Sequence, residues 1–329
     1  MRATDFRPHR LLRNAHIQSV LASSGMRRWL FRKRRALLEA QSTELILDCG
    51  DGVRLQGFHS PQQARPQARG LVVLLHGWEG SAQSSYLLHT AARLLAEGWD
   101  VFRLNFRDHG ETHHLNPEMF HSCRLDEVVG ALQDIARRYA PPKLALVGFS
   151  LGGNFALRVA LRAPAVALPL SYALAVCPAV HPPDILNAIE RAPWFYHAYF
   201  MLKWRGSLRR KQRLFPEAAR FSRSELGASM RQLTATMVAR HTDFGTLDTY
   251  LDGYSIAGDR LADLAVPATI LTASDDPIIP VDGFHQLKLS ASTELEIAPA
   301  GGHCGFIRDF SLHSWTEDFI AERLGRLTA

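Results

Sequence analysis

Long apolar runs are absent from this chain of 329 residues. No stretch approaches the roughly 20 apolar residues that cross a bilayer, and the N-terminus lacks the apolar segment and small-residue cleavage site of a secretory signal. The four cysteines are scattered and form no CxxC pair, which argues against a zinc site and against a disulfide framework. We therefore expect a globular cytoplasmic protein with reduced thiols.

Phosphate-binding glycine patterns are missing as well. Neither GxGxxG nor GxxxxGK[ST] follows an apolar, strand-like run, so we predict no nucleotide cofactor. Residues 107–123, RDHGETHHLNPEMFHSC, are rich in metal-ligating side chains, but their spacing fits no helical or zinc-finger ligand pattern. These side chains are Asp108, His109, His113, His114 and His121. We predict that they line the rim of a site and that the protein uses no metal and no other cofactor.

Acidic residues are scarce in the first 40 positions, although the whole chain carries a formal charge of only +6. This segment holds ten Arg and Lys against Asp5 and Glu39. Such a basic arm can bind nucleic acid or anionic lipid, whereas a solvated surface is the commoner explanation. We expect no nucleic-acid partner and leave open a peripheral membrane contact through this arm or through the basic, aromatic segment 194–213.

From residue 44 onward, short apolar runs alternate with helical stretches, which predicts a mostly parallel central sheet flanked by helices. Residues 44–59 read as an antiparallel hairpin with a turn at Cys49-Gly50-Asp51-Gly52. The further strands are predicted at 70–77, 99–106, 143–149, 170–177, 266–274 and 293–298, with helices near 84–97, 124–139, 151–162, 281–288 and 310–325.

The alternation stops at His181-Pro182-Pro183 and resumes near residue 266. Residues between these points are mainly helical, aromatic and basic in pattern. We therefore predict three parts: a basic helical arm over 1–40 that packs on the core, an α/β domain over 41–329, and a helical cap inserted into that domain over 181–262.

Ser150 lies in VGFSLGGN, between a buried-type strand and a helical stretch. A sharp strand–turn–helix elbow needs small residues, and Gly148, Gly152 and Gly153 supply them. The hydroxyl would then lie exposed at a helix N-terminus, whose partial positive charge favours developing negative charge. The alternative is that Ser150 only caps the helix. The elbow context favours a nucleophile.

A serine nucleophile requires a histidine base and a carboxylate that orients it. In the nucleophile-elbow order both follow the serine in the chain, each after a strand. Asp276 in TASDDPIIP and His303 in PAGGHCGF meet this condition. We choose Asp276 for its spacing from Pro280, and Asp275 remains an alternative acid. Either carboxylate could instead cap the following helix, and a lone loop histidine is more often solvated surface.

Acyl transfer also needs backbone N–H donors for the oxyanion, one after the nucleophile and one from the loop that follows the first parallel strand. Leu151 and Trp78 are the predicted donors. The loop LLHGWEGS contains Gly77 and Gly80, which permit a close approach. His76 in the same loop is expected to be structural.

Taken together, these motifs resemble the α/β-hydrolase superfamily over roughly residues 44–325. FRPHRLLRNAHIQS, HGWEGSAQSSY, GFSLGGN, DDPIIP and GGHCGF are similar to its YheT-like branch, which includes lipid-acting eukaryotic members. The resemblance implies ester hydrolysis by the triad Ser150, Asp276 and His303. It implies short acyl esters or acylglycerol-type lipids as substrates. One departure is NFRDHGETHHLN, where many members have a more glycine-rich stretch, and it bears on substrate preference.

The predicted function is therefore a serine hydrolase that cleaves carboxylic esters of small molecules or lipids. Two alternatives stay open. The same triad could transfer the acyl group to an alcohol or thiol, or the fold could bind a ligand without catalysis. Fold alone does not specify a substrate.

Overall fold

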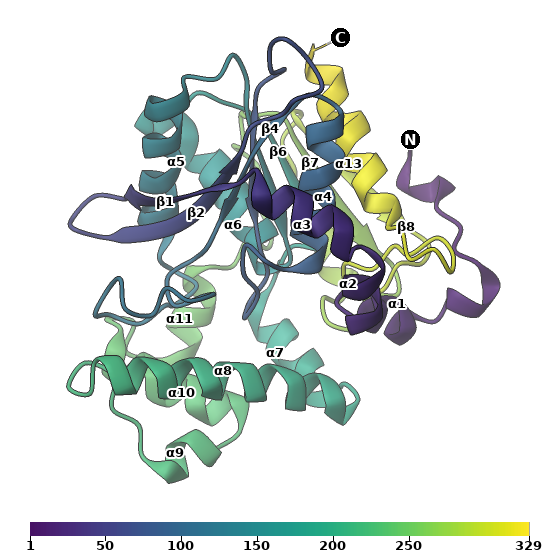
Figure 1. Cartoon of the computed structure of the whole chain (residues 1–329). Coiled ribbons are helices and arrows are strands. Elements are labelled where there is room, and N and C mark those ends of the chain that lie inside the picture. Colours follow the sequence, from purple (N-terminus) through teal and green to yellow (C-terminus); the bar gives the residue numbers. More distant parts are fainter. Residues whose placement is uncertain (329) are drawn as a thin grey trace.

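An eight-stranded sheet runs through the molecule (Figure 1), and the computed structural model describes residues 1–328. The strands are β1 (Thr43–Asp48), β2 (Arg54–Ser60), β3 (Leu71–Leu75), β4 (Asp100–Leu104), β5 (Leu144–Phe149), β6 (Leu170–Val176), β7 (Ala268–Ala273) and β8 (Thr293–Ala298). Their spatial order is β1-β2-β4-β3-β5-β6-β7-β8. The pairs β1–β2 and β2–β4 are antiparallel, and all other neighbours are parallel. The mostly parallel sheet of the sequence prediction is confirmed.

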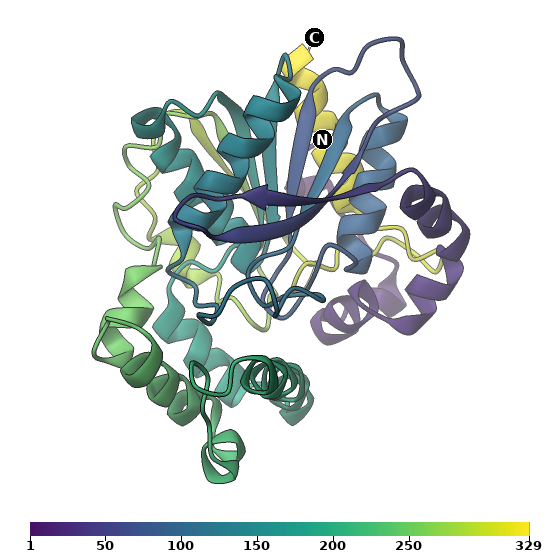
Figure 2. The ribbon, with the colours of Figure 1, turned by 60° about the vertical axis from the view of Figure 1, so that its left-hand side comes forward.

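Both faces of the central strands are covered, because successive side chains of a strand point to opposite faces. In β3, Leu71 and Val73 enter one core with α5 (Leu125–Tyr139) and α6 (Leu151–Arg162). Val72 and Leu74 enter the other core with α4 (Ser85–Ala96) and α13 (Trp315–Gly325). Figure 2 shows helices on both sides of the sheet. This double burial explains why β3 reads LVVLL rather than as an alternating pattern.

Between β6 and β7 the chain leaves the sheet and forms five helices. They are α7 (Pro182–Arg191), α8 (Trp194–Leu214), α9 (Arg223–Gly227), α10 (Met230–His241) and α11 (Leu247–Gly253), and we refer to them as the cap helices. Met201, Trp204 and Leu233 join the same hydrophobic core as α5 and α6. In Figure 1 the cap helices lie beneath the sheet, at the edge where its parallel strands end.

The first 40 residues form short helices, which we call the arm. They are η1 (Ala3–Asp5), η2 (Arg10–Leu12), α1 (Ala15–Ala22), α2 (Gly25–Leu30) and α3 (Arg32–Ala40). Ala3 and Phe6 are buried in the α4–α13 core. The Arg27 guanidinium is buried against the Glu317 carboxylate of α13. The arm is thus attached to the α4–α13 side of the sheet by both apolar and charged contacts.

Two predicted helices near the C-terminus differ from the observed ones. The helix expected at 281–288 is the single turn α12 (Asp282–His285). The helix expected to begin near residue 310 begins at Trp315, because Ile307 pairs with Ser314 in an antiparallel bridge that closes a tight loop. The remaining short helices are η3 (Ala163–Val166) and η4 (Arg326–Thr328).

Candidate active site

Ser150 occupies the turn between β5 and α6 in a strained conformation, with φ 54° and ψ −119°. A Cβ on Gly148 would meet the Gly152 carbonyl oxygen at 2.0 Å, and a Cβ on Gly152 would meet the His76 oxygen at 2.5 Å. Only glycine fits at both positions. The Ser150 hydroxyl makes no helix-capping hydrogen bond, so the capping alternative fails and the hydroxyl is free for another partner.

That partner is His303, whose ring lies between the serine and a carboxylate. His303 Nε2 is 3.0 Å from Ser150 Oγ, and His303 Nδ1 is 2.8 Å from Asp276 Oδ2. The Asp276 side chain is fully buried. Its other oxygen accepts hydrogen bonds from the Ile278 and Ile279 amides at 2.8 and 3.0 Å. The structure therefore brings the three predicted side chains into one hydrogen-bonded line.

Asp275 takes a different position. Its Oδ1 accepts a hydrogen bond of 2.9 Å from the Gly302 amide, just before the histidine. Of the two adjacent carboxylates, Asp276 therefore contacts the imidazole and Asp275 holds the backbone of the loop that carries it. Both residues lie in the turn that follows β7, where the Asp276 amide donates to the Ala273 oxygen at 3.2 Å.

Two opposing effects act on the pKa of His303. Burial disfavours the charged ring, whereas the negative charge of Asp276, the electrostatic effect of Cys304 and the hydrogen bond to Asp276 favour that form. Together they outweigh burial, so that the pKa of His303 rises from 6.5 to about 9. A carboxylate on Nδ1 also leaves the lone pair of Nε2 directed at the serine. The ring is thus held as a strong base.

The two predicted oxyanion residues lie beside the serine. Trp78 and Leu151 both line the cavity that contains Ser150 and His303. The Trp78 loop approaches the elbow so closely that a Cβ on Gly77 would lie 3.2 Å from Ser150 Cβ. Leu151 is the first residue of α6, so its N–H belongs to the unpaired donors of a helix N-terminus.

Several contacts hold the Trp78 loop in place. The backbone amide of Glu79 donates to His109 Nε2 at 3.2 Å, and the backbone carbonyl oxygen of Glu79 accepts from Lys203 Nζ of α8 at 3.1 Å. His76 is fully buried, with Nδ1 2.8 Å from the Gly77 oxygen and Nε2 accepting the Phe106 amide. Burial lowers the pKa of His76 well below its ordinary value, so the ring is neutral. It supports the loop, as the sequence predicts.

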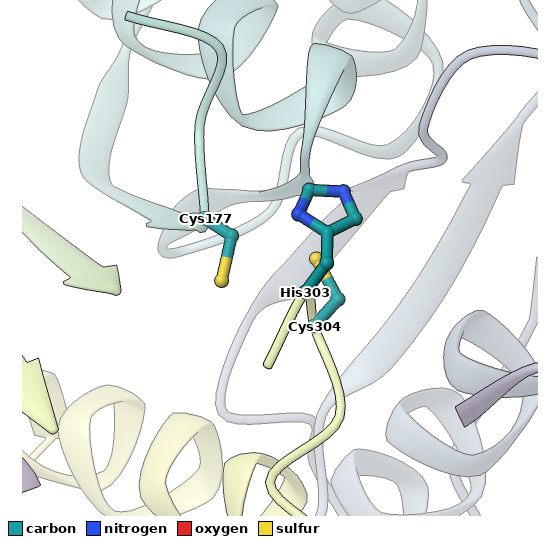
Figure 3. Close-up of side chains that lie close together, drawn as sticks. All are labelled: Cys177, His303 and Cys304. Carbon is teal, nitrogen blue, oxygen red and sulfur yellow. The ribbon is translucent and has the colours of Figure 1, made fainter. Parts of the chain in front are cut away.

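Three of the metal-ligating side chains of the 107–123 loop have other partners. Asp108 pairs with Lys211 of α8 at 2.7 Å, His109 holds the Trp78 loop, and His113 Nε2 lies 2.8 Å from Ser207 Oγ. Within residues 1–328, a group of three closely spaced metal-ligating side chains occurs elsewhere, at Cys177, His303 and Cys304. Figure 3 shows the His303 ring together with the two thiols.

A cavity of about 560 Å³ opens at the serine. Its size falls within the usual range of ligand pockets. The wall is mainly aromatic and aliphatic, and it draws on the Trp78 loop, the cap helices and α1. Representative lining residues are Phe120, Leu186, Phe200, Trp204, Met237 and Ile279. Such a wall suits an apolar group next to the reacting atoms.

The arm contributes residues to this site that sequence reasoning did not assign. Ser19 Oγ accepts the His303 amide at 2.8 Å. Gln18 is fully buried, donating to the Leu12 and Ile307 oxygens and accepting the Ile307 amide. His16 Nδ1 lies 3.1 Å from the Tyr196 hydroxyl of α8. The sequence indicates the segment NAHIQS only through a family resemblance, whereas in the structure this segment connects the histidine loop to the cap helices.

Sequence comparison agrees with this geometry. Residues 70–310 match the sequence model of the alpha/beta hydrolase fold, which is well over half of the chain. The chain belongs to the α/β-hydrolase fold family. This hydrolase is 28% identical over 337 residues to the YheT protein of Escherichia coli (strain K12), which is provisionally named an esterase. The match covers 98% of this chain and 93% of that protein. The hydrolase is thus YheT-like in sequence.

Two further comparisons concern named esterases. The hydrolase is 28% identical over 265 residues to a pimeloyl-[acyl-carrier protein] methyl ester esterase of Xanthomonas campestris pv. campestris (strain B100), covering 78% of this chain and 94% of that protein. The solved structure of the Pyrococcus furiosus esterase Pf2001 superposes with a TM-score of 0.59 at 16% identity, covering 89% of this chain and 94% of the other. The latter likeness concerns the fold alone. The named relatives support an esterase-like hydrolase in general.

Proposed function

We propose that this α/β hydrolase is a serine esterase that cleaves carboxylic esters through an acyl-enzyme intermediate. The observation that carries the proposal is the line of contacts from Ser150 Oγ through the His303 ring to Asp276, at 3.0 and 2.8 Å. A hydroxyl beside an imidazole that a carboxylate orients is the arrangement that activates serine for attack on a carbonyl.

In the first half-reaction, His303 Nε2 takes the proton of Ser150 as the oxygen attacks the ester carbonyl. Asp276 stabilises the imidazolium that forms and keeps Nδ1 protonated. Two backbone amides and the ring donate hydrogen bonds to the Asp276 oxygens, which fixes the carboxylate beside Nδ1. The imidazolium then protonates the departing alcohol.

The negative charge that develops on the carbonyl oxygen is received by the Trp78 and Leu151 amides. Fixed donors of this kind are effective because they need no reorganisation during the reaction. The positive end of the α6 dipole acts in the same direction. In the second half-reaction, His303 activates a water molecule that releases the acid and restores Ser150.

The acyl part of the substrate is proposed to enter the apolar cavity. Phe200 and Trp204 of α8 pack against the Trp78 ring, with centroid distances of 5.4 and 5.5 Å. Burial raises the pKa of Glu79 to about 8, so this acidic residue of the wall is mostly neutral near pH 7. Both features favour an apolar acyl chain, as in short acyl esters or acylglycerol-type lipids.

The test is a panel of p-nitrophenyl esters of rising acyl length, measured with wild type, Ser150→Ala and the exposed serine control Ser311→Ala. We expect Ser150→Ala to lose at least roughly 10⁴-fold in kcat/KM, while Ser311→Ala retains activity. A serine-directed fluorophosphonate should label Ser150, with the adduct located by mass spectrometry.

Other outcomes would change the proposal. Residual activity of Ser150→Ala near the wild-type level would refute the nucleophile. Ester formation that replaces hydrolysis when an alcohol is added would identify an acyltransferase. Absence of both turnover and fluorophosphonate labelling in the folded wild type would leave a ligand-binding member of the fold.

A further inference from the structure

Large apolar side chains are exposed mainly in two segments. Among residues 1–328, fourteen are exposed: seven lie in the arm, four lie in α8, and three lie elsewhere. The arm contributes Leu11, Ile17, Val20, Met26, Trp29, Leu30 and Leu37, and α8 contributes Trp194, Tyr199, Leu202 and Leu214. The Trp29 and Trp194 side chains are 61% and 80% exposed. Single exposed apolar residues are ordinary, but a concentration of this kind marks an interaction surface.

The two segments meet at the mouth of the cavity. The arm contacts the start of α8 through His16 and Tyr196, and Figures 1 and 2 both show α1 and α2 next to α8. Val20 and Arg28 line the cavity from the arm, and Tyr199 and Lys203 line it from α8. All four side chains are also exposed to solvent. The cavity therefore opens between the two exposed apolar segments.

The same segments carry unpaired positive charge. Within residues 1–328, eleven exposed basic side chains of these two segments form no ion pair with a carboxylate. They are Arg2, Arg7, Arg10, Arg13, Arg28, Arg32, Lys33 and Arg34 of the arm and Lys203, Arg209 and Arg213 of α8. Arg32 lies over the Trp29 ring at 4.5 Å, and Lys203 lies over the Tyr199 ring at 4.9 Å. Helices that carry exposed indoles together with Arg and Lys are typical of elements that lie in a lipid interface.

We propose that the arm and α8 together bind the surface of an anionic lipid bilayer, with the cavity mouth facing the membrane. The basic side chains match the negative surface potential, and the exposed apolar side chains enter the headgroup boundary. An ester dissolved in the bilayer could then pass to Ser150 without crossing bulk water. Only this last step rests on the proposed esterase function, because binding itself does not require turnover.

The experiment is flotation of the full-length protein with vesicles of phosphatidylcholine alone and with vesicles that also contain phosphatidylglycerol, at low and high salt. We expect binding to the phosphatidylglycerol vesicles at low salt, weaker binding at high salt, and little binding to phosphatidylcholine. The Ser150→Ala variant should bind like the wild type, so a failure of catalysis and a failure of docking are distinguishable.

Two surface variants separate the charge from the apolar contribution. The charge variant combines Arg32→Glu, Lys33→Glu and Arg34→Glu and should lower vesicle partitioning by roughly 100-fold. The apolar variant combines Trp29→Ser and Leu202→Ser and should also weaken partitioning. The matched control is Ile46→Ser with Leu161→Ser, two exposed apolar residues outside the surface. Circular dichroism checks the fold of each variant. Equal binding of all variants, or no binding of the wild type at low salt, would overturn the proposal. Salt-sensitive capture of an acidic protein without vesicle binding would assign the surface to a protein partner.

A second inference rests on a separate observation, the two thiols beside the candidate base (Figure 3). Cys177 Sγ, Cys304 Sγ and a ring nitrogen of His303 lie within 4.8 Å of one another. Cys177 follows β6 and is buried, whereas Cys304 follows His303 and lines the cavity. A solute in the cavity can therefore reach two of the three donors, His303 and Cys304, with Cys177 directly behind them.

Two thiolates and one imidazole form a donor set that suits Zn²⁺. With Zn–S bonds of about 2.3 Å, tetrahedral ligation separates two sulfur atoms by about 3.8 Å, so closing the site requires movements of about 1 Å. We infer that Zn²⁺ binds here as an inhibitor. Both thiols release their protons to solvent on binding. The metal also takes a ring nitrogen that otherwise faces Ser150 or Asp276, so the base is lost.

The binding measurement uses Ser150→Ala, so that it does not depend on catalysis. Co²⁺ serves as a spectroscopic probe, and we expect a thiolate charge-transfer band that Cys177→Ser removes. The inhibition measurement follows esterase activity as Zn²⁺ is added, and each variant is compared with its own metal-free rate. Inhibition of the wild type should reverse with a chelator and weaken at least tenfold in Cys177→Ser. Cys49→Ser is the matched control, since Cys49 is also a buried free thiol.

Two results would overturn the inference. One is a Co²⁺ spectrum without a thiolate band. The other is Zn²⁺ inhibition of equal strength in wild type and Cys177→Ser, which would assign the metal to other ligands. If only the esterase assay fails, the Co²⁺ binding measurement still decides the inference.

Discussion

The two histidine-bearing loops of this hydrolase use the same residue type in opposite ways. In the 107–123 loop, burial lowers the pKa of His109 to about 4, and the ring accepts the Glu79 amide as a neutral support. In the loop after β8, the charge of Asp276 outweighs burial and raises the pKa of His303 to about 9. The difference shows that a buried carboxylate partner raises the pKa of a histidine, whereas a high local density of histidine does not.

Removing one histidine from each loop tests whether the two residues have different roles. We expect His303→Ala to lose about 10⁴-fold in kcat, because the serine loses its proton acceptor, with little change in the thermal unfolding midpoint. His109→Ala should instead leave the Glu79 amide unpaired and lower stability by about 1–3 kcal/mol. Ester turnover and thermal denaturation of both variants measure the two effects. A similar loss of kcat in both would contradict the division of roles.

The adjacent carboxylates sharpen the comparison next. Asp276→Asn should reduce kcat by about 10³- to 10⁴-fold, since an amide neither stabilises the imidazolium nor enforces the tautomer. Asp275→Asn keeps an acceptor for the Gly302 amide and should lose less than about tenfold. Steady-state kinetics on one short-chain ester compare the two. If Asp275→Asn were the more damaging change, the assignment of the acid would be reversed.

The pH dependence tests the raised pKa of His303. The imidazolium has no lone pair to accept the Ser150 proton, so kcat/KM should fall below about pH 9, roughly tenfold per pH unit. Activity should recover as the pH rises through the pKa of His303, because the ring then becomes neutral. Profiles between pH 6 and 10 provide the measurement. In Asp276→Asn, the residual activity should show its midpoint at lower pH, and an unshifted midpoint would exclude Asp276 as the cause.

The smallest expected effect concerns the arm. Gln18→Ala leaves the Ile307 amide buried without its acceptor, so we expect a stability loss of about 1–3 kcal/mol. Displacement of the histidine loop should reduce kcat by about tenfold while KM changes little. Urea denaturation and ester kinetics check both numbers. Gln18→Asn, which keeps both an acceptor and a donor, should recover more of kcat than Gln18→Ala, and equal rates would argue for a general packing role.

Much of the frame could be predicted because its determinants are local. The apolar runs predicted the strands within a few residues, and the small residues of VGFSLGGN predicted the elbow that the φ of Ser150 displays. The order of Ser150, Asp276 and His303 along the chain followed from the strands that they succeed. The prediction was wrong for the start of α13, because a bridge between Ile307 and Ser314 competes with the helix.

What the sequence by itself determined about this hydrolase is the alternation of strands and helices, the strained elbow and the chain order of the candidate triad. These depend on hydrophobic period and on backbone freedom at glycine, which act between near neighbours. The tertiary structure alone decided that Asp276 faces the imidazole, that the arm supports the histidine loop, and that Cys177 and Cys304 come together. Such contacts join residues that are far apart in the chain, and no local pattern specifies which distant side chains the packed sheet brings within bonding distance.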